Sequence, residues 1–232
     1  MKSVLIIGGN CDIGKCLSRY FLDNGYNVVI GYHKNNEIND DRIRCIKCDI
    51  TDIDSIDNII KITIDMYGNI DIIINLACLC MDSSFMDKTK EEFMRVLEVN
   101  LVGTFLCNQI YCKYIDDGMI INIASTDGVD TYNEYNIDYS ASKAGVINIS
   151  KSIARCTNNK VLCLVPNWID TSSTRLMDSD YLHSELDRIG QDRLIMIDEF
   201  VNSIDKIVNS EFNSGDIFRI DIKGDKLWVE RM

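Results

Sequence analysis

The chain has 232 residues, of which 46% are hydrophobic, and its formal net charge is −12. This length suits one α/β domain with a full hydrophobic core, and the composition excludes an intrinsically disordered chain. The acidic balance argues against a nucleic-acid-binding protein, which would normally carry a basic face.

The apolar runs of the chain are too short for targeting or for membrane insertion. Residues 4–7 form the first of them, and this stretch is shorter than the core of a signal peptide. The richest later run, residues 72–81, is interrupted by Asn75 and falls well below the length of a membrane span. We therefore expect a cytoplasmic protein with no membrane partner.

Short apolar runs alternate with segments of helical periodicity along the whole chain. The runs predict strands at residues 4–7, 28–30, 45–48, 72–74, 119–123, 161–165 and 217–220. Helical spacing predicts helices from residue 13 to Gly25, from residue 53 to Gly68, and at 93–114, 138–155 and 199–208. Strands that are apolar throughout are buried on both faces. We therefore expect a doubly wound, Rossmann-type parallel sheet of about seven strands in a three-layer α/β/α domain over residues 1–232.

The ten cysteines are irregularly spaced, and in a chain of this size they do not indicate a disulfide framework. Cys45 and Cys48 form a Cys-x-x-Cys pair, but a spacing of three in a strand points the side chains to opposite faces. A zinc site would need further ligands, and His33 and His183 are the only histidines. We therefore predict no metal site.

A glycine cluster, formed by Gly8, Gly9 and Gly14, lies between the first predicted strand and the first predicted helix. In a doubly wound fold this turn lets the backbone approach a pyrophosphate, and the helix N-terminus supplies N–H donors and a positive dipole end. The cluster predicts a nucleotide site. A tight turn that only packs the helix against the sheet is the alternative.

Asp49 closes the third predicted strand. At this position a carboxylate can accept a hydrogen bond from an adenine amino group. It can also cap the following helix, although Thr51 or Asp52 could do that equally well. Both interpretations stay open for Asp49.

Tyr139 and Lys143 form a Tyr-x-x-x-Lys pair on the helix predicted at 138–155, and the i, i+4 spacing puts both on one face. The unperturbed pKa of a phenol is about 10, and a nearby ammonium lowers it by stabilising the phenolate. The pair can therefore exchange a proton with an alcohol/carbonyl couple. Ser125 lies just beyond the fifth predicted strand, where its hydroxyl can face the same cleft, and Asn100 lies in the preceding long helix.

These segments resemble the short-chain dehydrogenase/reductase family, in its single-domain, 3-oxoacyl-ACP reductase-like form, over nearly the whole chain. The matching motifs follow the family's order: IGGNCDIG at 7–14, NLAC at 75–78, NLVG at 100–103, INIAS at 121–125, YSASKA at 139–144, PNWIDT at 166–171, and QDRL with DEF at 191–194 and 198–200. The resemblance implies an oxidoreductase that transfers a hydride between a nicotinamide dinucleotide and a carbonyl or secondary alcohol substrate.

The resemblance also implies a role for each residue of the site. Tyr139 would be the general acid/base and Ser125 would polarise the carbonyl. Lys143 would hold the nicotinamide ribose and lower the tyrosine pKa, and Asn100 would anchor a water that links Lys143 to solvent. The cofactor-binding residues it implies are Gly8, Asn10, Asp12, Ile13, Asp49, Ile50, Asn75, Ala77, Tyr139, Lys143, Pro166, Ile169 and Thr171.

The end of the second predicted strand bears on the choice of cofactor. NAD-specific relatives place an acid here, and its carboxylate binds the ribose 2′-hydroxyl. This chain has Tyr32 instead, followed by His33 and Lys34. Both basic residues can donate to a 2′-phosphate, so we expect NADP(H) over NAD(H). A Lys34 that is merely solvated is the alternative.

Two further expectations concern the partners. The substrate is a small carbonyl or alcohol compound, and residues 172–197 would form a lid over it. Family members pack their long helices into dimers or tetramers, so we expect a homodimer or homotetramer. The long helix supplies apolar residues beyond those that one sheet face needs: Phe93, Val96, Leu101, Phe105 and Ile110.

The chain departs from the family pattern at several positions. Asp12 and Cys78 replace glycines, Leu76 replaces an asparagine, and Asn167 replaces the glycine after Pro166, where asparagine tolerates left-handed backbone angles. The segment before Pro166 is a few residues shorter than usual, which shortens a helix that often forms the dimer interface. Two other functions stay open: a catalytically silent NADP(H) sensor, and an isomerase or dehydratase on the same fold.

Overall fold

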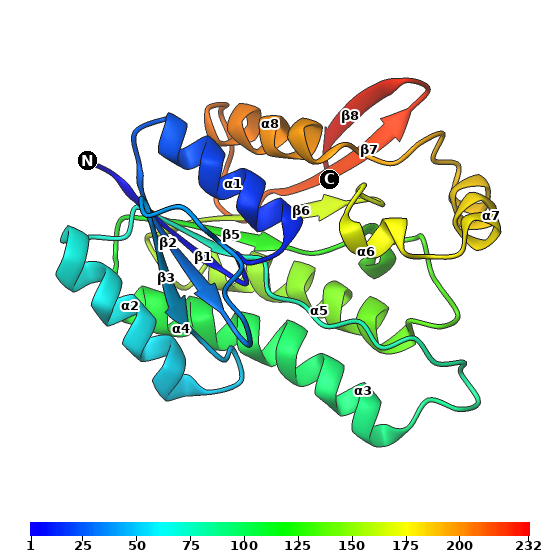
Figure 1. Ribbon diagram of the computed structural model, residues 1–232, viewed down its shortest axis with the longest axis horizontal. Coiled ribbons are helices and arrows are strands. Elements are labelled where there is room, and N and C mark those ends of the chain that lie inside the picture. The colour runs from blue at the N-terminus through cyan, green and yellow to red at the C-terminus, as the bar shows by residue number, and fades with distance from the viewer.

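One eight-stranded sheet runs through the centre of the computed structural model, which describes residues 1–232 (Figure 1). Its strands lie in the order β3-β2-β1-β4-β5-β6-β7-β8. Strands β1 to β7 are parallel, and β8 pairs antiparallel with β7. The strands are β1 Ser3–Ile7, β2 Asn27–Tyr32, β3 Ile43–Lys47, β4 Ile72–Asn75, β5 Met119–Ile123, β6 Lys160–Pro166, β7 Ile217–Lys223 and β8 Lys226–Arg231.

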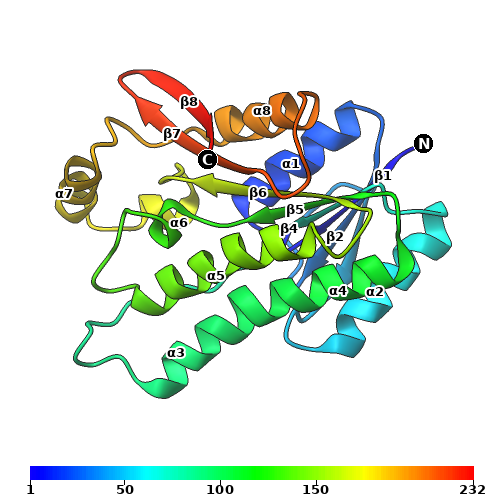
Figure 2. The ribbon, with the colours of Figure 1, turned by 180° about the vertical axis from the view of Figure 1, so that it is seen from behind.

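Helices cover both faces of this sheet (Figures 1 and 2). Helices α1 and α8 lie on one face, and α2, α4 and α5 lie on the other, as the three-layer prediction requires. The helices are α1 Asp12–Asp23, α2 Ile53–Tyr67, α3 Lys90–Leu97, α4 Thr104–Tyr114, α5 Ile137–Ile153, α6 Ser172–Arg175, α7 Ser179–Ile189 and α8 Ile197–Val208.

The central strands are apolar at every position because both of their faces are buried. In β1, Val4 and Ile6 pack into the core beneath α1 and α8, whereas Leu5 and Ile7 pack into the core beneath α2 and α4. Successive side chains of a strand point to opposite faces, so a strand between two helix layers needs apolar residues throughout. Burial on both faces of the sheet therefore explains the uninterrupted apolar runs that predicted these strands.

Helices α3 and α4 form the one long helix that the sequence predicts, joined by a π-helical segment, Glu98–Gly103. Thr89 begins it with a capping box: its hydroxyl accepts from the Glu92 N–H, and the Glu92 carboxylate accepts from the Thr89 N–H. A π-helical turn inside a helix often marks a functional site, and this one carries Asn100.

The sheet has eight strands, not about seven, and the unexpected one is β8. This edge strand is largely exposed, and its short apolar stretch, residues 227–229, lies between charged residues; no strand was predicted there. Strand β3 spans Ile43–Lys47 rather than 45–48, because Ile43 and Arg44 also pair with β2. Cys48 is buried on the α2 side and Cys45 packs on the α1 side, as their spacing predicts.

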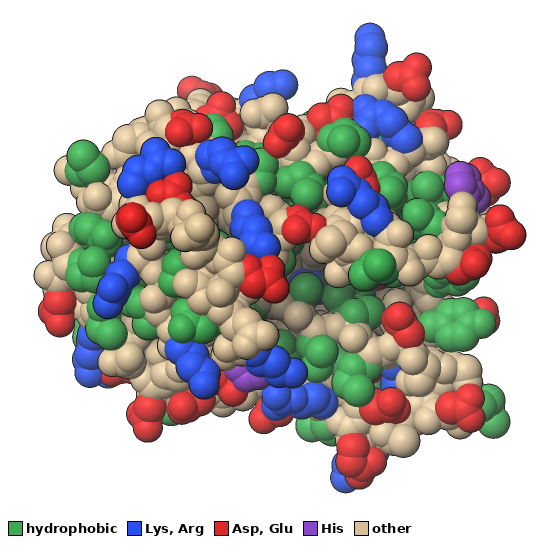
Figure 3. All heavy atoms as spheres, in the orientation of Figure 1, with side chains coloured by type: hydrophobic (Ala, Val, Ile, Leu, Met, Phe, Trp, Pro, Cys, Tyr) green, Lys and Arg blue, Asp and Glu red, His purple; other side chains and the backbone are tan.

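Acidic and basic side chains are interspersed over the face shown in Figure 3. Near the middle of this face the surface is hollowed, with hydrophobic side chains at the bottom of the hollow. No helix combines the length and the apolar composition that crossing a membrane would require.

Candidate active site

The glycine turn lies where the strand order reverses, between β1 and its neighbour β4. Ligands of doubly wound folds bind at such a switch point, beyond the carboxyl ends of the strands. Gly8 has a left-handed φ of 79° and its N–H donates to the Gly31 carbonyl at 3.0 Å. A Cβ at Gly8 would lie 2.5 Å from the backbone of Ala77, the second residue after β4. The turn is therefore closely packed against the end of β4 and depends on this glycine.

The N-terminus of α1 faces the same edge of the sheet. Cys11 caps it, with its sulfur accepting from the Gly14 N–H at 3.4 Å, and Asp12 and Ile13 form the first turn. A Cβ at Gly14 would lie 2.3 Å from the Gly9 carbonyl oxygen, so the helix starts in close contact with the turn. The first N–H groups of a helix have no partner within the helix, and here they are placed to receive an anionic group.

Two polar side chains of the turn bind other loops. The Asn10 amide donates to the Asn35 carbonyl at 2.7 Å and accepts from the Glu37 N–H at 2.9 Å, so it fixes the loop that follows β2. The Asp12 carboxylate accepts from the Ser172 N–H at 2.6 Å, and this hydrogen bond lowers the Asp12 pKa. Both residues hold loops around the turn, so any contact that they make with a cofactor would use the backbone.

His33 and Asp49, both expected to bind cofactor, contact each other: the His33 Nε2 lies 3.4 Å from the Asp49 carboxylate, which makes an ion pair when His33 is protonated. Asp49 also accepts from the N–H and the hydroxyl of Thr51, at 2.9 and 2.7 Å, and the backbone N–H contributes most to its lowered pKa. The cap of α2 is Asp52, not Asp49. Lys34 is exposed and forms no ion pair, which leaves it available for a phosphate.

The side chain of Asn75 is used inside the protein. Its amide donates to the side-chain oxygens of Asn108 at 2.6 Å and Asn122 at 2.8 Å, and Asn122 in turn donates to the Ser150 hydroxyl at 2.9 Å. This buried network ties β4 to β5, α4 and α5. Ile50 is buried against Gly103 of the π-helical segment.

Tyr139, Lys143 and Ser125 come together at the carboxyl end of β5. The Lys143 ammonium lies 5.4 Å from the centre of the Tyr139 ring and donates to the Ile123 carbonyl at 2.8 Å. Lys143 is 3% exposed, so its charge is almost fully withdrawn from water. The Ser125 hydroxyl interacts with the Tyr139 phenol and also accepts from the Asp127 N–H at 3.2 Å.

The protein's own groups raise the pKa of Tyr139 well above its usual value. Burial has the largest effect, Cys78, Asp127 and Cys80 add to it, and Ser125 opposes it. The net shift is upward because burial dominates, and the role of Lys143 in lowering this pKa stays a prediction. Desolvation disfavours the phenolate, and the Lys143 ammonium is held by a main-chain carbonyl.

The side chain of Asn100 connects two parts of the site through hydrogen bonds. Its side-chain oxygen accepts from the Leu79 N–H at 2.7 Å, and its NH₂ donates to the Leu79 carbonyl at 2.8 Å and to the Ser142 hydroxyl at 3.0 Å. The amide thus joins the segment after β4 to helix α5. Its role in a water relay stays a prediction.

The remaining motif lies at the end of β6, where Pro166 is the last residue of the strand. Ile169 is 8% exposed and forms an isolated bridge with Ile195, and Thr171 caps α6. Asn167 does not use its tolerance of left-handed angles, because no residue other than glycine has a positive φ. Residues 172–197 carry α6 and α7.

Three buried charged groups near Tyr139 were not predicted: Lys88, Asp127 and Asp138. Asp138 directly precedes Tyr139, and that adjacency was the one available signal. The buried state of Lys88 has no signature in a segment that is otherwise polar. Asp127 follows Ser125 by two residues, and burial is the largest influence that raises its pKa.

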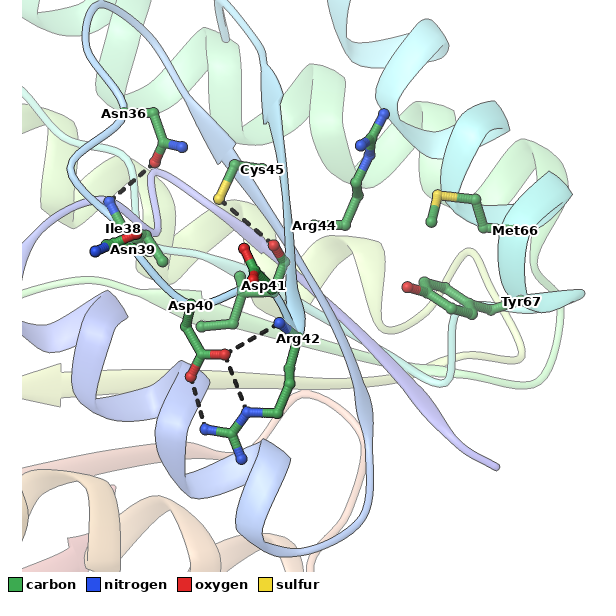
Figure 4. A pocket seen from close by; sticks show the side chains of 11 residues that line it. Asn36, Ile38, Asn39, Asp40, Asp41, Arg42, Arg44, Cys45, Met66 and Tyr67 are labelled. Atoms are coloured by element: carbon green, nitrogen blue, oxygen red, sulfur yellow. Dashed lines mark hydrogen bonds and ion pairs between the residues drawn. The ribbon is translucent and has the colours of Figure 1, made fainter.

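A separate hollow of about 500 Å³ lies on the outer edge of the sheet beside β3 (Figure 4). Its walls come from the loop before β3, from β3 itself and from Met66 and Tyr67 at the end of α2. Arg42 binds Asp40 within it through contacts of 2.6 and 3.0 Å. None of the residues implied in catalysis or cofactor binding lines this hollow.

Comparison with known proteins agrees with this arrangement. Residues 2–181 match the family described as short chain dehydrogenase. The chain is 30% identical over 186 residues to an uncharacterized oxidoreductase of Thermotoga maritima, covering 74% of this chain and 72% of that protein. It is 28% identical over 192 residues to a 3-oxoacyl-[acyl-carrier-protein] reductase of Synechocystis, covering 76% and 77%.

A solved structure extends the likeness over almost the full length. A short chain dehydrogenase from Leptospira borgpetersenii, with bound NAD+, is 28% identical and matches 95% of this chain and 91% of its own with a TM-score of 0.84. The family match and the doubly wound sheet therefore agree. The chain belongs to the short-chain dehydrogenase/reductase family and is an NAD(P)-dependent oxidoreductase.

Proposed function

We propose that this protein interconverts a carbonyl compound and a secondary alcohol with NADP(H), and that Tyr139 is its general acid/base. The observation that carries the proposal is the convergence of Ser125, Tyr139 and Lys143 at the end of β5. The glycine turn lies close by, because Gly8 packs against Ala77, the residue before Cys78. After burial, which has the largest effect, Cys78 raises the pKa of both Tyr139 and the turn residue Cys11.

The residues around the turn fit a dinucleotide. Gly8 allows the turn to pack closely against Ala77 at the end of β4, and the first turn of α1 offers N–H groups to an anionic group. Residues 166–171 would lie beside the nicotinamide, and Lys143 would bind its ribose. When bound, the dinucleotide would supply or accept the hydride.

The chain's own groups would handle the proton. Tyr139 keeps its proton on the phenol oxygen at neutral pH, because the ordinary pKa of a phenol is about 10 and burial raises it further, so it can donate that proton to the carbonyl oxygen of the substrate. The Ser125 hydroxyl can donate a hydrogen bond to the same oxygen and polarise the carbonyl. In the reverse direction Tyr139 accepts the proton, and the Lys143 ammonium stabilises the phenolate so formed.

The test of this role is Tyr139→Phe, which removes the hydroxyl and keeps the ring. We expect turnover to fall by at least about 100-fold, the usual size of a general-acid effect, with dinucleotide affinity unchanged. Tyr135→Phe is the matched control, because Tyr135 is 40% exposed on the loop before α5. Near-normal activity of Tyr139→Phe would refute the assignment. Turnover of a simple ketone by the unmodified protein would also separate the oxidoreductase from a silent sensor or an isomerase.

The preference for NADP(H) rests mainly on Lys34. Asp49 already compensates His33 when His33 is charged, whereas Lys34 is exposed and unpaired. A lysine–phosphate contact is a charge-assisted hydrogen bond. The Leptospira relative holds NAD+, so the KM values for NADPH and NADH with one substrate are the decisive measurement. A preference for NADH, or no change in Lys34→Ala combined with His33→Ala, would overturn the proposal.

The entrance to the site suggests a substrate without negative charge. The segments that follow β4, β5 and β6 carry four exposed apolar side chains: Phe85, Met86, Tyr132 and Leu176. The lid adds the carboxylates of Asp178, Asp180 and Glu185, which disfavour a phosphorylated or carboxylate-rich substrate. In a panel of carbonyl compounds followed by NADPH oxidation, neutral ketones, sugars and thioesters should be reduced faster than carboxylates of similar size.

We also propose a homo-oligomer, on a smaller surface than the sequence suggested. Of the five apolar residues expected there, Val96 and Ile110 are buried within the protomer. Phe105 is exposed, and Met94 and Val102 are exposed on the same long helix. Light scattering at micromolar concentration should give a dimer or tetramer, and Phe105→Glu should shift it towards the monomer.

A further inference from the structure

Asp138, the residue that directly precedes the proposed general acid, forms a buried ion pair with Lys88. The Lys88 ammonium is 3.0 Å from the Asp138 carboxylate, and the two side chains are 6% and 0% exposed. A buried ion pair is weak evidence for stability, because desolvation offsets much of the attraction between the charges. Its burial beside the site therefore calls for a role other than stabilising the fold.

Asp138 belongs to the same helical turn as Tyr139. One of its carboxylate oxygens pairs with Lys88, and the other accepts from the Tyr139 N–H at 2.9 Å. The carboxylate thus contacts both the lysine and the backbone of the catalytic tyrosine. Any movement of Lys88 would be transmitted to the first turn of α5.

Lys88 also holds the segment that forms the other wall of the site. Its ammonium donates to the Met81 carbonyl. Two residues earlier, Leu79 is bound at both its N–H and its carbonyl by Asn100, which also binds Ser142 on α5. Residues 78–81 include the two thiols, Cys78 and Cys80, that influence the Tyr139 pKa. This wall is therefore attached to α5 at two points, through Asn100 and through Lys88.

We infer that Lys88 and Asp138 are positioning residues, which lock residues 79–88 against the first turn of α5 and so fix Tyr139 relative to the substrate. This inference rests on the proposed role of Tyr139. Neither residue is placed to contact substrate or cofactor. A misplacement of about 1 Å can reduce a rate by about 100-fold, so losing the lock should lower kcat much more than it changes dinucleotide binding.

The first variant is Lys88→Met, which replaces the ammonium with an apolar side chain of similar length. We expect kcat for reduction by NADPH of the neutral ketone that is reduced fastest in the carbonyl panel to fall about 10- to 100-fold, with the dissociation constant for NADPH within about twofold. Lys90→Met is the matched control, because Lys90 is an exposed lysine at the start of α3. Lys90→Met should leave kcat and the dissociation constant unchanged.

A second variant separates positioning from folding. Lys88→Met leaves Asp138 buried without its partner, and this alone destabilises a protein. Lys88→Met combined with Asp138→Asn removes that unpaired charge while keeping an acceptor for the Tyr139 N–H. We expect the double variant to recover the thermal midpoint but not kcat. A kcat that recovers together with the midpoint would overturn the inference.

Hydrogen exchange supplies a readout that needs no substrate. In Lys88→Met the amides of residues 79–88 and of the first turn of α5 should exchange faster, whereas Lys90→Met should leave them unchanged. Unchanged exchange in Lys88→Met would also overturn the inference. The turnover of Tyr139→Phe separates the positioning role of Lys88 from the proposed function. If Tyr139→Phe keeps its activity, the proposed function fails. If it is inactive while Lys88→Met is normal, only the positioning role fails.

Discussion

The glycine turn is packed so closely against the end of β4 that a side chain at Gly8 should destabilise the protein. Gly25 offers a matched control for this effect. Gly8 and Gly25 have nearly the same left-handed φ, 79° and 77°. A Cβ at Gly8 would lie 2.5 Å from the Ala77 backbone, whereas a Cβ at Gly25 would meet no atom within 4 Å. Substitution by alanine at either position therefore carries the same conformational penalty, and only Gly8→Ala adds a steric clash.

The magnitudes follow from these two contributions. A left-handed conformation costs an alanine about 1–2 kcal/mol, and the lower entropy of the unfolded alanine chain offsets about 0.4–1 kcal/mol. Both terms are common to the two variants and cancel in their difference. Overpacking costs about 1–3 kcal/mol, so Gly8→Ala should lose about that much more free energy of unfolding than Gly25→Ala.

Urea denaturation measures the two free energies of unfolding, and calorimetric titration with NADPH measures binding. We expect Gly8→Ala to weaken NADPH binding more than tenfold, because Ala77 and the turn must move apart at the proposed pyrophosphate site. Gly25 lies at the other end of α1, so Gly25→Ala should bind NADPH normally. Equal losses of stability in the two variants, or unchanged binding in Gly8→Ala, would refute this account of the turn.

Three further predictions concern charge and protonation. Asp12→Asn keeps an acceptor for the Ser172 N–H but removes a charge from the N-terminus of α1. A charge there is worth about 0.3–1 kcal/mol, so NADPH should bind about two- to fivefold more tightly in a calorimetric titration, and weaker binding would contradict the expectation. Because the pKa of Tyr139 is raised, its proton is lost only as the pH rises through that higher value. The kcat/KM for carbonyl reduction should therefore stay flat between about pH 7 and 9, and a midpoint below pH 8 would show that another group is the acid. Asp52→Ala should lower the free energy of unfolding by about 1 kcal/mol, because Asp52 caps α2, and a changed NADPH affinity in this variant would mean that Asp52 also serves the site.

The sequence predicted the central sheet well because local and tertiary preferences agree there. Residues 4–7 and 72–74 are apolar without interruption, and only double burial in a parallel sheet explains such runs. Strand β8 was not predicted, since its apolar residues 227–229 form only a short stretch between charged residues at the exposed edge of the sheet. That strand forms because Gly224, with a φ of 60°, turns the chain back along β7.

The chemistry of the site was predictable from residue types, but its connections were not. Tyr139 and Lys143 are brought together by the period of one helix, so their proximity follows from the sequence. The pKa of Tyr139 depends on burial by segments far away in the chain, and no local pattern encodes that burial. The partner of Lys88 lies 50 residues further on and is set by how the loop before α3 packs against the first turn of α5.

Asp12 shows how a substitution inside a motif can act outside it. At this position the family has a glycine, so the sequence alone directs attention to the pyrophosphate. In the structure the Asp12 carboxylate accepts from the N–H of Ser172, the first residue of α6, at 2.6 Å. The turn and the lid are therefore joined by a side chain that a glycine could not supply. Because this acceptor lies at the same helix end that would receive an anion, the lid contact and the cofactor compete for one region of positive potential. The effect of Asp12 is thus expected on the coupling between cofactor binding and lid position rather than on the shape of the turn.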